Sequence, residues 1–409
     1  MQGMKDGGNV WYGKIPNHWK LNKIKYLTTI RSESAIYNPE EDKYIGLENV
    51  NGYSDNVVET DTEYDYSMQS ICKKDDILFS KLRPYLAKVF IAKHNSFCTG
   101  EFIVFSSFNG DRRYLFYSIL NPKFIENINS STYGAKMPRA NPQYIFDQQI
   151  CLPPLVEQQR IAEFLDRECG KTDGLKADIQ AQIDTLEEYK RSVITEAVTH
   201  GLNPSAPMKD SGIPWVGETP EYWKVGRIGG LYELRNQKVS DKDFMPLSVT
   251  MKGILPQLET AAKTNDGDNR KLVRVGDFAI NSRSDRRGSC GISDYDGSVS
   301  LINTILKPRN RMNAKYYNWL FHTPMFADEF YKWGHGIVDD LWTTNWSEMK
   351  RISIPLPPLD EQQEIADYLD NKCAEIEQII ADKKSQIETL DGYKKSLIYE
   401  YVTGKKEVV

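Results

Sequence analysis

The chain repeats itself at one fixed offset. Three pairs of segments, each separated by 204 positions, match over most of their length. One offset that persists along the whole chain indicates two tandem copies, at about 4–207 and 208–409. The pairs are MKDGGNVWYGKIPNHWK (4–20) with MKDSGIPWVGETPEYWK (208–224), LPPLVEQQRIAEFLD (152–166) with LPPLDEQQEIADYLD (356–370), and QIDTLEEYKRSVITE (182–196) with QIETLDGYKKSLIYE (386–400).

The stretches between the matched ends have diverged. Residues 21–150 and 225–354, the two bodies, resemble each other only faintly. KKDDILFSKLRP (73–84) and RVGDFAINSRSDRR (274–287) each predict an acidic turn, a short apolar strand and a basic loop. Simple duplication of one stable domain would spread the differences evenly. Here the matched segments form a frame that is retained around each divergent body. This contrast favours a common partner for the frames and different ligands for the bodies.

Each frame closes with a predicted long helix. After two consecutive prolines, about 40 residues rich in Glu, Gln, Lys, Ala and Leu contain no proline. A helix over 157–199 or 361–403 is roughly 64 Å long, which is too long for a compact domain of this size. We expect the two helices to pair antiparallel about an approximate two-fold, with the bodies at opposite ends. The alternative for such a sequence is an ordinary buried core helix.

Apolar residues at heptad-like spacing predict the paired face of each helix. Gly170 and Gly174 occur in the first helix alone and predict a local bend. The tryptophans of the opening segments, Trp11, Trp19, Trp215 and Trp223, are predicted to be structural anchors. The predicted apolar stripes are Leu175, Ile179, Ile183, Leu186 and Val193 in the first helix, and Ile376, Ile380, Ile387, Leu390 and Leu397 in the second.

Charge is distributed unevenly. The net charge of the chain is -5, which by itself argues against a nucleic-acid partner. Segment by segment, 155–200 carries -4 and 355–409 carries -5, whereas the bodies carry -1 (21–150) and +4 (225–354). The helices account for the acidity, so the bodies remain compatible with DNA.

Basic residues of the bodies gather in loops that also contain aromatic and amide side chains. Arg and Lys suit phosphates and guanine edges, and Asn suits adenine edges. An isolated basic loop is more often a solvated surface, but such loops recur at similar places in both bodies. The predicted DNA contacts are Lys81, Arg83, Lys88, Tyr133, Lys136, Arg139, Asn141, Asn281, Arg283, Ser284, Arg286, Arg287, His335, Trp342 and Asn345.

The sequence contains no recognisable catalytic or metal site. The six cysteines form no C-x-x-C pair and the five histidines no H-E-x-x-H, so free thiols in a reducing cytoplasm are expected. No phosphate-binding loop or nucleophile elbow is present. NPQY (141–144) is interpreted as a turn and not as a methyltransferase tetrad, and PEEDK (39–43) as an exposed charged turn. Without an apolar membrane span or signal segment, we expect a cytoplasmic protein.

Taken together, the doubled LPPLxEQQxIAxxLD and W-x-G-x-x-P-x-x-W segments resemble the specificity subunit of type I restriction-modification systems, the HsdS family. GAKMPRAN (134–141) is also similar to a stretch found in target-recognition domains of that family. The second body has GHGIVDDLWTTN in its place, so contacts in one copy do not predict those in the other.

The resemblance implies an α+β fold with two α/β target-recognition domains in tandem, separated by two long antiparallel coiled-coil helices. The expected domains are 1–150 and 204–354 for recognition, and 151–203 and 355–409 for the spacer helices. Each recognition domain would read one half of a bipartite asymmetric DNA site, and the helices would set its spacing.

The resemblance also implies the partners. Two modification (methyltransferase) subunits would dock on the helices, and restriction (motor-nuclease) subunits would join them. The chain itself would hold no cofactor and perform no catalysis, because S-adenosylmethionine, ATP and Mg would bind the partner subunits. The alternatives are a divergent DNA methyltransferase or nuclease, and a coiled-coil scaffold that binds only proteins.

Overall fold

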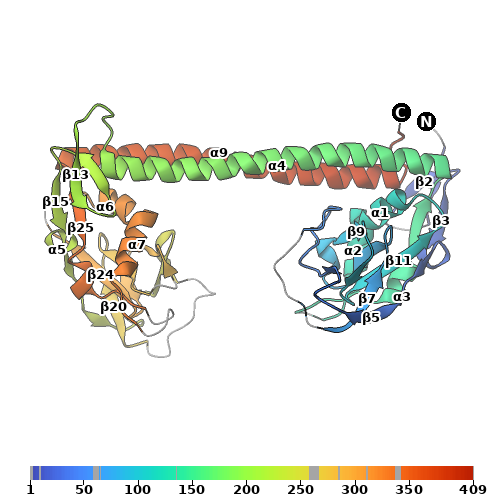
Figure 1. The fold of residues 1–409 in the computed structure, drawn as a ribbon, viewed down its shortest axis with the longest axis horizontal. Helices are drawn as coiled ribbons and strands as arrows, with labels where there is room; N and C mark the ends of the chain where they lie inside the picture. Colours follow the sequence, from blue (N-terminus) through green and yellow to red (C-terminus); the bar gives the residue numbers. More distant parts are fainter. Residues whose placement is uncertain are drawn as a thin grey trace. The chain divides into compact units, whose positions relative to one another are not determined.

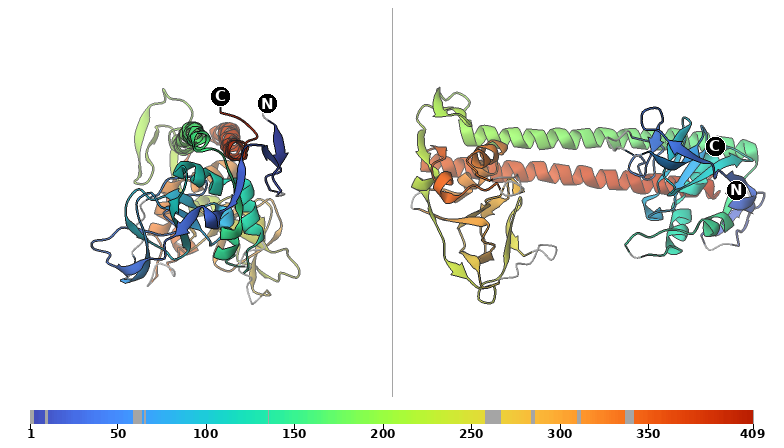
Figure 2. Two further views of the ribbon diagram at one scale, coloured as in Figure 1. Left: turned by 90° about the vertical axis from the view of Figure 1, so that its right-hand side faces the viewer. Right: turned by 60° about the horizontal axis from the view of Figure 1, so that its bottom comes forward.

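The computed structural model mixes helices and short strands in two compact units. Unit 1 combines 1–180 with 384–409, and unit 2 contains 181–383. Both chain ends belong to unit 1 and lie close together there (Figures 1 and 2). The structure describes residues 3–8, 11–58, 64, 66–134, 136–257, 267–283, 286–309, 312–336 and 342–408.

The body of unit 1 is built on two four-stranded sheets. An inner sheet has the order β4-β11-β8-β9, and an outer sheet has the order β5-β7-β10-β6, in which the β10–β6 pair is parallel. The elements are β4 (Thr28–Ile30), β5 (Ser34–Tyr37), β6 (Tyr44–Ile45), β7 (Ser67–Cys72), β8 (Ile77–Ser80), β9 (Val89–Ile91), β10 (Ser96–Cys98), β11 (Phe102–Phe108), α1 (Arg112–Leu120), α2 (Pro122–Ser130) and α3 (Pro142–Asp147).

Strand alternation gives this body two cores. Ile77 and Phe79 of β8 point to the core that α1, α2 and the long helices complete, whereas Leu78 between them points to the core that includes Cys72 and Cys98 of the outer sheet. Successive residues of a strand face opposite sides. The inner sheet is therefore buried on both faces, as the uninterrupted apolar run of β8 requires.

The body of unit 2 repeats the inner sheet, but its outer strands form two smaller sheets, β17-β20-β23 and β18-β19. Its inner sheet has the order β16-β24-β21-β22, and Phe278 and Ala279 of β21 face different cores. The elements are β16 (Tyr232–Leu234), β17 (Lys238–Val239), β18 (Leu247–Thr250), β19 (Gly253–Pro256), β20 (Arg270–Val273), β21 (Phe278–Asn281), β22 (Cys290–Ile292), β23 (Gly297–Val299), β24 (Asn303–Pro308), α5 (Ile228–Leu231), α6 (Ala314–Phe321), α7 (Pro324–Lys332) and α8 (Trp346–Met349).

The first and last strands of each body pair with each other, so the body ends where it began. In unit 1 β3 pairs antiparallel with β12, and in unit 2 β15 pairs with β25. A hairpin formed by the repeated opening segment precedes each pair. The bounds are β1 (Met4–Asp6), β2 (Lys14–Pro16), β3 (Lys20–Lys23) and β12 (Gln149–Leu152), and β13 (Met208–Ile213), β14 (Gly217–Pro220), β15 (Lys224–Arg227) and β25 (Ser353–Leu356).

The two predicted long helices are confirmed. The structure has α4 at Leu155–His200 and α9 at Leu359–Val402. Both begin directly after the double proline, two residues earlier than predicted, because the proline carbonyl already accepts the first helical hydrogen bonds. The helix α4 runs through Gly170 and Gly174 without interruption.

The predicted apolar stripes are largely confirmed, with one error. Ile183 and Val193 of α4 are buried, as are Ile376, Ile380 and Leu397 of α9. Leu175, however, is 53% exposed, so its inclusion in the stripe was wrong. Near Leu175, the residues of α4 that lie on the buried face are Thr172 and Lys176. A heptad face advances alternately by three and four residues, and Leu175 is not in that register.

Ion pairs across the helix pair establish its antiparallel direction within each unit. In unit 1 Lys394 bonds Asp173 at 2.6 Å, and Lys176 bonds Asp391. In unit 2 Lys190 bonds Glu377, which is the same pair moved by 204 positions. In both units, residues late in one helix thus meet residues early in the other.

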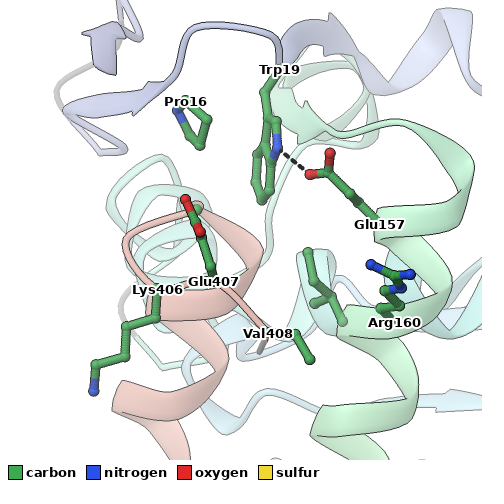
Figure 3. A pocket seen from close by; sticks show the side chains of 9 residues that line it. Pro16, Trp19, Glu157, Arg160, Lys406, Glu407 and Val408 are labelled. Carbon is green, nitrogen blue, oxygen red and sulfur yellow. Dashed lines mark hydrogen bonds between the residues drawn. The ribbon is translucent and has the colours of Figure 1, made fainter. Parts of the chain in front are cut away.

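A glutamate of each long helix holds the repeated opening segment. The indole N–H of Trp19 donates to Glu157 at 2.8 Å, and that of Trp223 donates to Glu361 at 2.9 Å. Trp19 and Trp223 are 3% and 1% exposed, which confirms them as structural anchors. Figure 3 shows Trp19 beside Pro16 with its indole nitrogen toward the carboxylate, at a cavity of about 230 Å³.

The next glutamine of the motif joins the helix to the body. The side-chain oxygen of Gln158 accepts the backbone N–H of Asp111, and that of Gln362 accepts the N–H of Asn313, both at 2.9 Å. Asp111 and Asn313 are the caps of α1 and α6. Each glutamine is buried and also donates to the carbonyl of a preceding proline. These bonds fix the angle at which the body meets the helix.

The last aspartate of the motif completes the joint. Asp166 accepts from Arg113 at 2.9 Å, and Asp370 accepts from Lys315 at 2.8 Å and from the indole of Trp319 at 3.0 Å. The repeated polar residues of LPPLxEQQxIAxxLD therefore bind a body to its own helix. They recur in both copies because each copy has the same joint between its body and its long helix.

Smaller predictions had mixed outcomes. The turn at PEEDK is confirmed, and all six cysteines are free and buried. The interpretation of NPQY as a turn was wrong, because Asn141 caps the helix α3 and Pro142 opens it. Trp215 packs on Phe326 and donates to the carbonyl of Ser353, as an anchor does, while Trp11 is half-buried.

None of the described helices is long and apolar enough to cross a membrane. The domain boundaries expected at 150, 203 and 354 remain predictions. The two compact units instead divide each long helix between them.

The two helical glycines predict a gain in stability. A Cβ at Gly170 or Gly174 meets no atom within 4 Å. We therefore expect Gly170→Ala and Gly174→Ala each to raise the free energy of unfolding by about 1 kcal/mol. Chemical denaturation followed by circular dichroism measures the change. The matched control is Gly201→Ala, which should destabilise the protein, because Gly201 has a φ of +77° and a Cβ there lies 2.8 Å from Glu361 Oε1. A loss of stability in the helical variants would contradict the expectation.

Candidate nucleic-acid interface

In unit 1 two basic loops meet in a small backbone ladder. Tyr133 and Arg139 exchange two backbone hydrogen bonds of 3.2 and 3.0 Å, which closes the loop that contains GAKMPR. On its other side Arg139 pairs with Leu82, and the N–H of Ala140 donates to the carbonyl of Lys81 at 2.9 Å. The loop after β8 and the loop before α3 therefore lie side by side.

Unit 2 builds the same ladder from different residues. His335 and Thr343 exchange two backbone hydrogen bonds of 3.0 Å, and Thr343 also pairs with Arg283. The N–H of Thr344 donates to the carbonyl of Ser282 at 3.0 Å. His335 thus occupies the place of Tyr133, Thr343 that of Arg139, and Arg283 that of Leu82. The two ladders have the same pattern of backbone hydrogen bonds, although their sequences are little alike.

A buried ion pair precedes each ladder. Arg31 donates to both oxygens of Asp76 at 2.7 and 3.2 Å, and Arg235 donates to both oxygens of Asp277 at 2.5 and 3.0 Å. The two carboxylates are 1% and 2% exposed and also accept backbone N–H groups of their own turns. This confirms the acidic turn predicted at 73–84 and 274–287. The turn leads into β8 or β21, and the basic loop follows that strand.

The described residues contain no group of three or more His, Cys, Asp or Glu that could hold a metal ion. At or beside each ladder, cationic, amide and aromatic side chains lie exposed or half-buried on a hydrogen-bonded backbone. Such groups bind phosphates and base edges.

A family model for the type I restriction modification DNA specificity domain matches the chain twice, over 18–185 and 220–389. The chain belongs to this family. Specificity subunits are the non-catalytic recognition subunits of type I restriction-modification systems, and this chain is one of them.

Relatives agree with this assignment, and solved structures share the fold. The putative type I restriction enzyme MjaX specificity subunit of Methanocaldococcus jannaschii is 24% identical over 427 residues, which cover 97% of this chain and 95% of the relative. A solved chain from a study of complex assembly and conformational transition of the type I R-M system has a TM-score of 0.70 at 16% identity, covering 96% of this chain and 99% of the other. The HsdS subunit of Thermoanaerobacter tengcongensis has a TM-score of 0.50 at 16% identity, covering 96% and 98%.

The predicted contacts of this specificity subunit divide into two groups in the first body. Lys88 turns inward, since its ammonium group donates to the carbonyl of Leu47 at 2.5 Å and desolvation lowers its pKa. Asn141 accepts the N–H of Gln143 at 2.9 Å as the cap of α3. The ammonium group of Lys88 and the side-chain oxygen of Asn141 are therefore engaged within the fold. The remaining predicted residues lie at the ladder, exposed or half-buried: Lys81, Arg83, Tyr133, Lys136 and Arg139.

The second body divides in the same way. Asn281 is buried and accepts the N–H of Arg283, and the indole of Trp342 donates to the carbonyl of Tyr331 at 2.7 Å. Arg287 donates to Asp328 at 2.8 Å and lies over the ring of Tyr331. Ser284 lies outside the described residues. Those on or beside the ladder with exposed or half-buried side chains are Arg283, Arg286, His335 and Asn345.

One residue of this surface was missed by the sequence-based predictions. Glu101 accepts two hydrogen bonds from the guanidinium group of Arg139, which raise the pKa of Arg139. Glu101 directly precedes β11, so it is 38 positions from Arg139 in the sequence. No spacing rule connects the two residues. Only the pairing of β8 with β11 and the ladder bring them together.

Variants of Asn141 distinguish a role of this residue in stability from a role in DNA binding. We expect Asn141→Ala to lower the free energy of unfolding by about 1 kcal/mol, because the N–H of Gln143 loses its acceptor. Asn141→Asp keeps the cap and should keep the stability. Thermal unfolding of the three proteins measures this, and specific DNA affinity is measured in parallel. A stable Asn141→Asp variant that loses specific binding would show that the Asn141 side chain lies at the DNA.

Proposed function

We propose that each body reads one half of a bipartite, asymmetric DNA site with its ladder, and that the long helices set the distance between the half-sites. The observation that carries the proposal is the equivalent ladder backbone in two bodies that differ in sequence. An equivalent backbone places side chains at equivalent positions relative to DNA. Different side chains on it give different base preferences.

The charges of the ladders support a DNA ligand. Arg83 and Lys136 are exposed in the first body, and Arg286 is exposed in the second. Positive side chains on both bodies suit phosphate contacts, whereas the acidity of the chain is concentrated in the helices. A scaffold that binds only proteins would not need basic ladders on both bodies.

We propose further that the helices dock two copies of one partner, the modification (methyltransferase) subunit. Each helix carries a second heptad stripe beside the buried one, and this second stripe is exposed. Its residues are the same or similar in both helices. They are Leu175, Asp178, Gln182, Thr185, Tyr189 and Ser192 in α4, and Ile379, Asp382, Gln386, Thr389, Tyr393 and Ser396 in α9.

Internal packing does not account for this stripe. Leu175 is 53% exposed and Ile379 45%, while Tyr189 and Tyr393 are 48% and 51% exposed. Other exposed helix positions differ between the copies, such as Gly174 against Gln378, Gln180 against Lys384 and Glu188 against Gly392. Apolar groups retained twice in water favour a common protein partner.

The ion pairs place the apolar residues of the stripe at common levels. In unit 1 the Asp173–Lys394 pair brings Leu175 and Tyr393 to one level of the helix pair. In unit 2 the Lys190–Glu377 pair does the same for Tyr189 and Ile379. Each unit therefore offers one equivalent surface, which supports two partner copies for each chain.

Restriction (motor-nuclease) subunits would join this complex. The S-adenosylmethionine, ATP and Mg that the reactions require would bind in the partner subunits, and the complex would act on DNA in the cytoplasm.

The central test is adenine methylation. We expect the chain with its modification subunit and S-adenosylmethionine to methylate one two-part motif, and the chain alone to methylate nothing. Genome-wide mapping of methylated adenines in a host that expresses both proteins measures the motif. Methylation by the purified chain alone would favour the alternative of a divergent methyltransferase. Methylation without sequence preference would contradict DNA reading by the bodies.

The same mapping tests the spacing. A heptad inserted into both helices at the level where Lys383 donates to Gln182 adds roughly 10 Å, or about three base pairs, to the distance along DNA. The half-sites should stay unchanged and the spacer should lengthen. Changed half-sites with the old spacer would contradict the role of the helices.

The docking surfaces predict a stepwise loss of partners. The double variant Leu175→Glu/Tyr393→Glu should remove one modification subunit from the complex, because two carboxylates replace apolar contacts. Ile379→Glu/Tyr189→Glu should remove the other. Native mass spectrometry measures the stoichiometry. The control Gln180→Glu/Gly392→Glu changes exposed positions that differ between the copies and should keep both partners. Full assembly of the first two variants would contradict the proposed surface.

A further inference from the structure

The backbone of Arg139 is paired on both sides. It is paired with Tyr133 on one side and with Leu82 on the other. The neighbouring Ala140 is 1% exposed, which anchors the chain directly after it. The N–H of Lys81 donates to the backbone carbonyl of Glu101 at 3.0 Å, so the backbone of Glu101 lies beside the same ladder.

The guanidinium group is held as firmly as the backbone. Nε of Arg139 donates to Oε2 of Glu101 at 3.2 Å, and Nη2 donates to Oε1 at 2.8 Å. The Arg139 side chain is 40% exposed and the Glu101 side chain 25% exposed. A fork of this kind fixes the plane of the guanidinium and the direction in which it points.

The fork also determines which donors remain. Guanidinium has five N–H groups, and the bond from Nε with one bond from Nη2 uses one edge. The distal edge, with one N–H of Nη1 and the second of Nη2, faces away from the carboxylate. Two parallel donors on that edge match O6 and N7 of guanine in the major groove. A phosphate contact does not require such orientation, because charge alone is sufficient for it.

We propose that Arg139 specifies a guanine in the half-site of the first body and that Glu101 is the positioning residue that aims it. This inference rests on the proposed function and adds the identity of one base in the DNA site. Arg139 is the specificity-determining residue, since it touches the base. Glu101 does not bind the base itself, because its carboxylate is repelled by the acceptor atoms on that edge of guanine. It acts through Arg139, whose guanidinium group it attracts and orients.

The second body shows what changes when the pair is absent. Thr343 occupies the ladder position of Arg139, and Ile302 takes the place of Glu101, since its carbonyl accepts the N–H of Ser282 as Glu101 accepts that of Lys81. The same backbone thus presents a hydroxyl and an aliphatic side chain. A guanine specified from this ladder position is therefore expected in one half-site only.

The experiment uses the complex of the full chain with its modification subunits. The methylated motif is mapped for the unchanged protein and for Arg139→Lys and Glu101→Gln. We expect Arg139→Lys to make one fixed G·C position degenerate, since lysine keeps the charge but lacks the two parallel donors. Discrimination at that position, measured by competition between duplexes, should fall about 5-fold to 150-fold. The other positions of the motif should not change.

We expect Glu101→Gln to lower discrimination at the same base pair by a smaller factor. One acceptor remains, but the paired hydrogen bonds to the guanidinium group are lost. Arg112→Lys is the matched control in the same body. Arg112 also lies beside a carboxylate, with Nη1 at 3.8 Å from Asp75, but it is outside the ladder. We expect it to leave the motif unchanged. Thermal unfolding of all variants confirms that they are folded.

The outcomes separate this inference from the proposed function. Sequence-independent methylation by the unchanged complex overturns the proposed function itself. A two-part motif that Arg139→Lys does not alter overturns only the guanine assignment. A uniform loss of affinity for all duplexes, with a smaller salt dependence, identifies Arg139 as a phosphate contact and overturns it as well. The guanine assignment is also overturned if the position that loses discrimination is an A·T pair.

Discussion

The joint between each body and its long helix is the interaction on which the rest of the structure depends. A body of short strands and a helix of more than 40 residues have no shared secondary structure to hold them together. Glu157, Gln158 and Asp166 form the joint in unit 1, and Glu361, Gln362 and Asp370 form it in unit 2. Because these groups are buried or half-buried and bonded in fixed directions, the body keeps one orientation on the helix.

A fixed orientation matters for a DNA specificity subunit. Sequence is read by side chains that reach base edges, and an error of an ångström at the joint is amplified at the loops. The pairing of β3 with β12 and of β15 with β25 brings the ends of each body together at the joint. Beyond that point, the residues that do not bond to the helix can diverge without disturbing it. The bodies have used this freedom: one ladder presents Arg139 and the other presents Thr343.

Sequence and structure agree best where periodicity is long and repeated. The helices were predicted to within two residues, because double prolines and heptad spacing are local signals. Leu175 shows the limit of that approach. Its spacing fitted the buried stripe, but α4 carries two adjacent heptad faces, and spacing alone does not say which of them faces the other helix. Asn141 shows another limit, because an asparagine before proline suits both a turn and a helix cap.

The sequence by itself determined the duplication, the long helices, the position of the basic loops and the resemblance to specificity subunits. These follow from order and spacing along the chain. Only the tertiary structure decided which loop residues are available, because Lys88 and Asn281 are drawn into the fold while Arg83 and Arg139 stay at the surface. It also decided that Glu101 meets Arg139. That contact depends on strand pairing between distant segments, and no local pattern in the sequence encodes it.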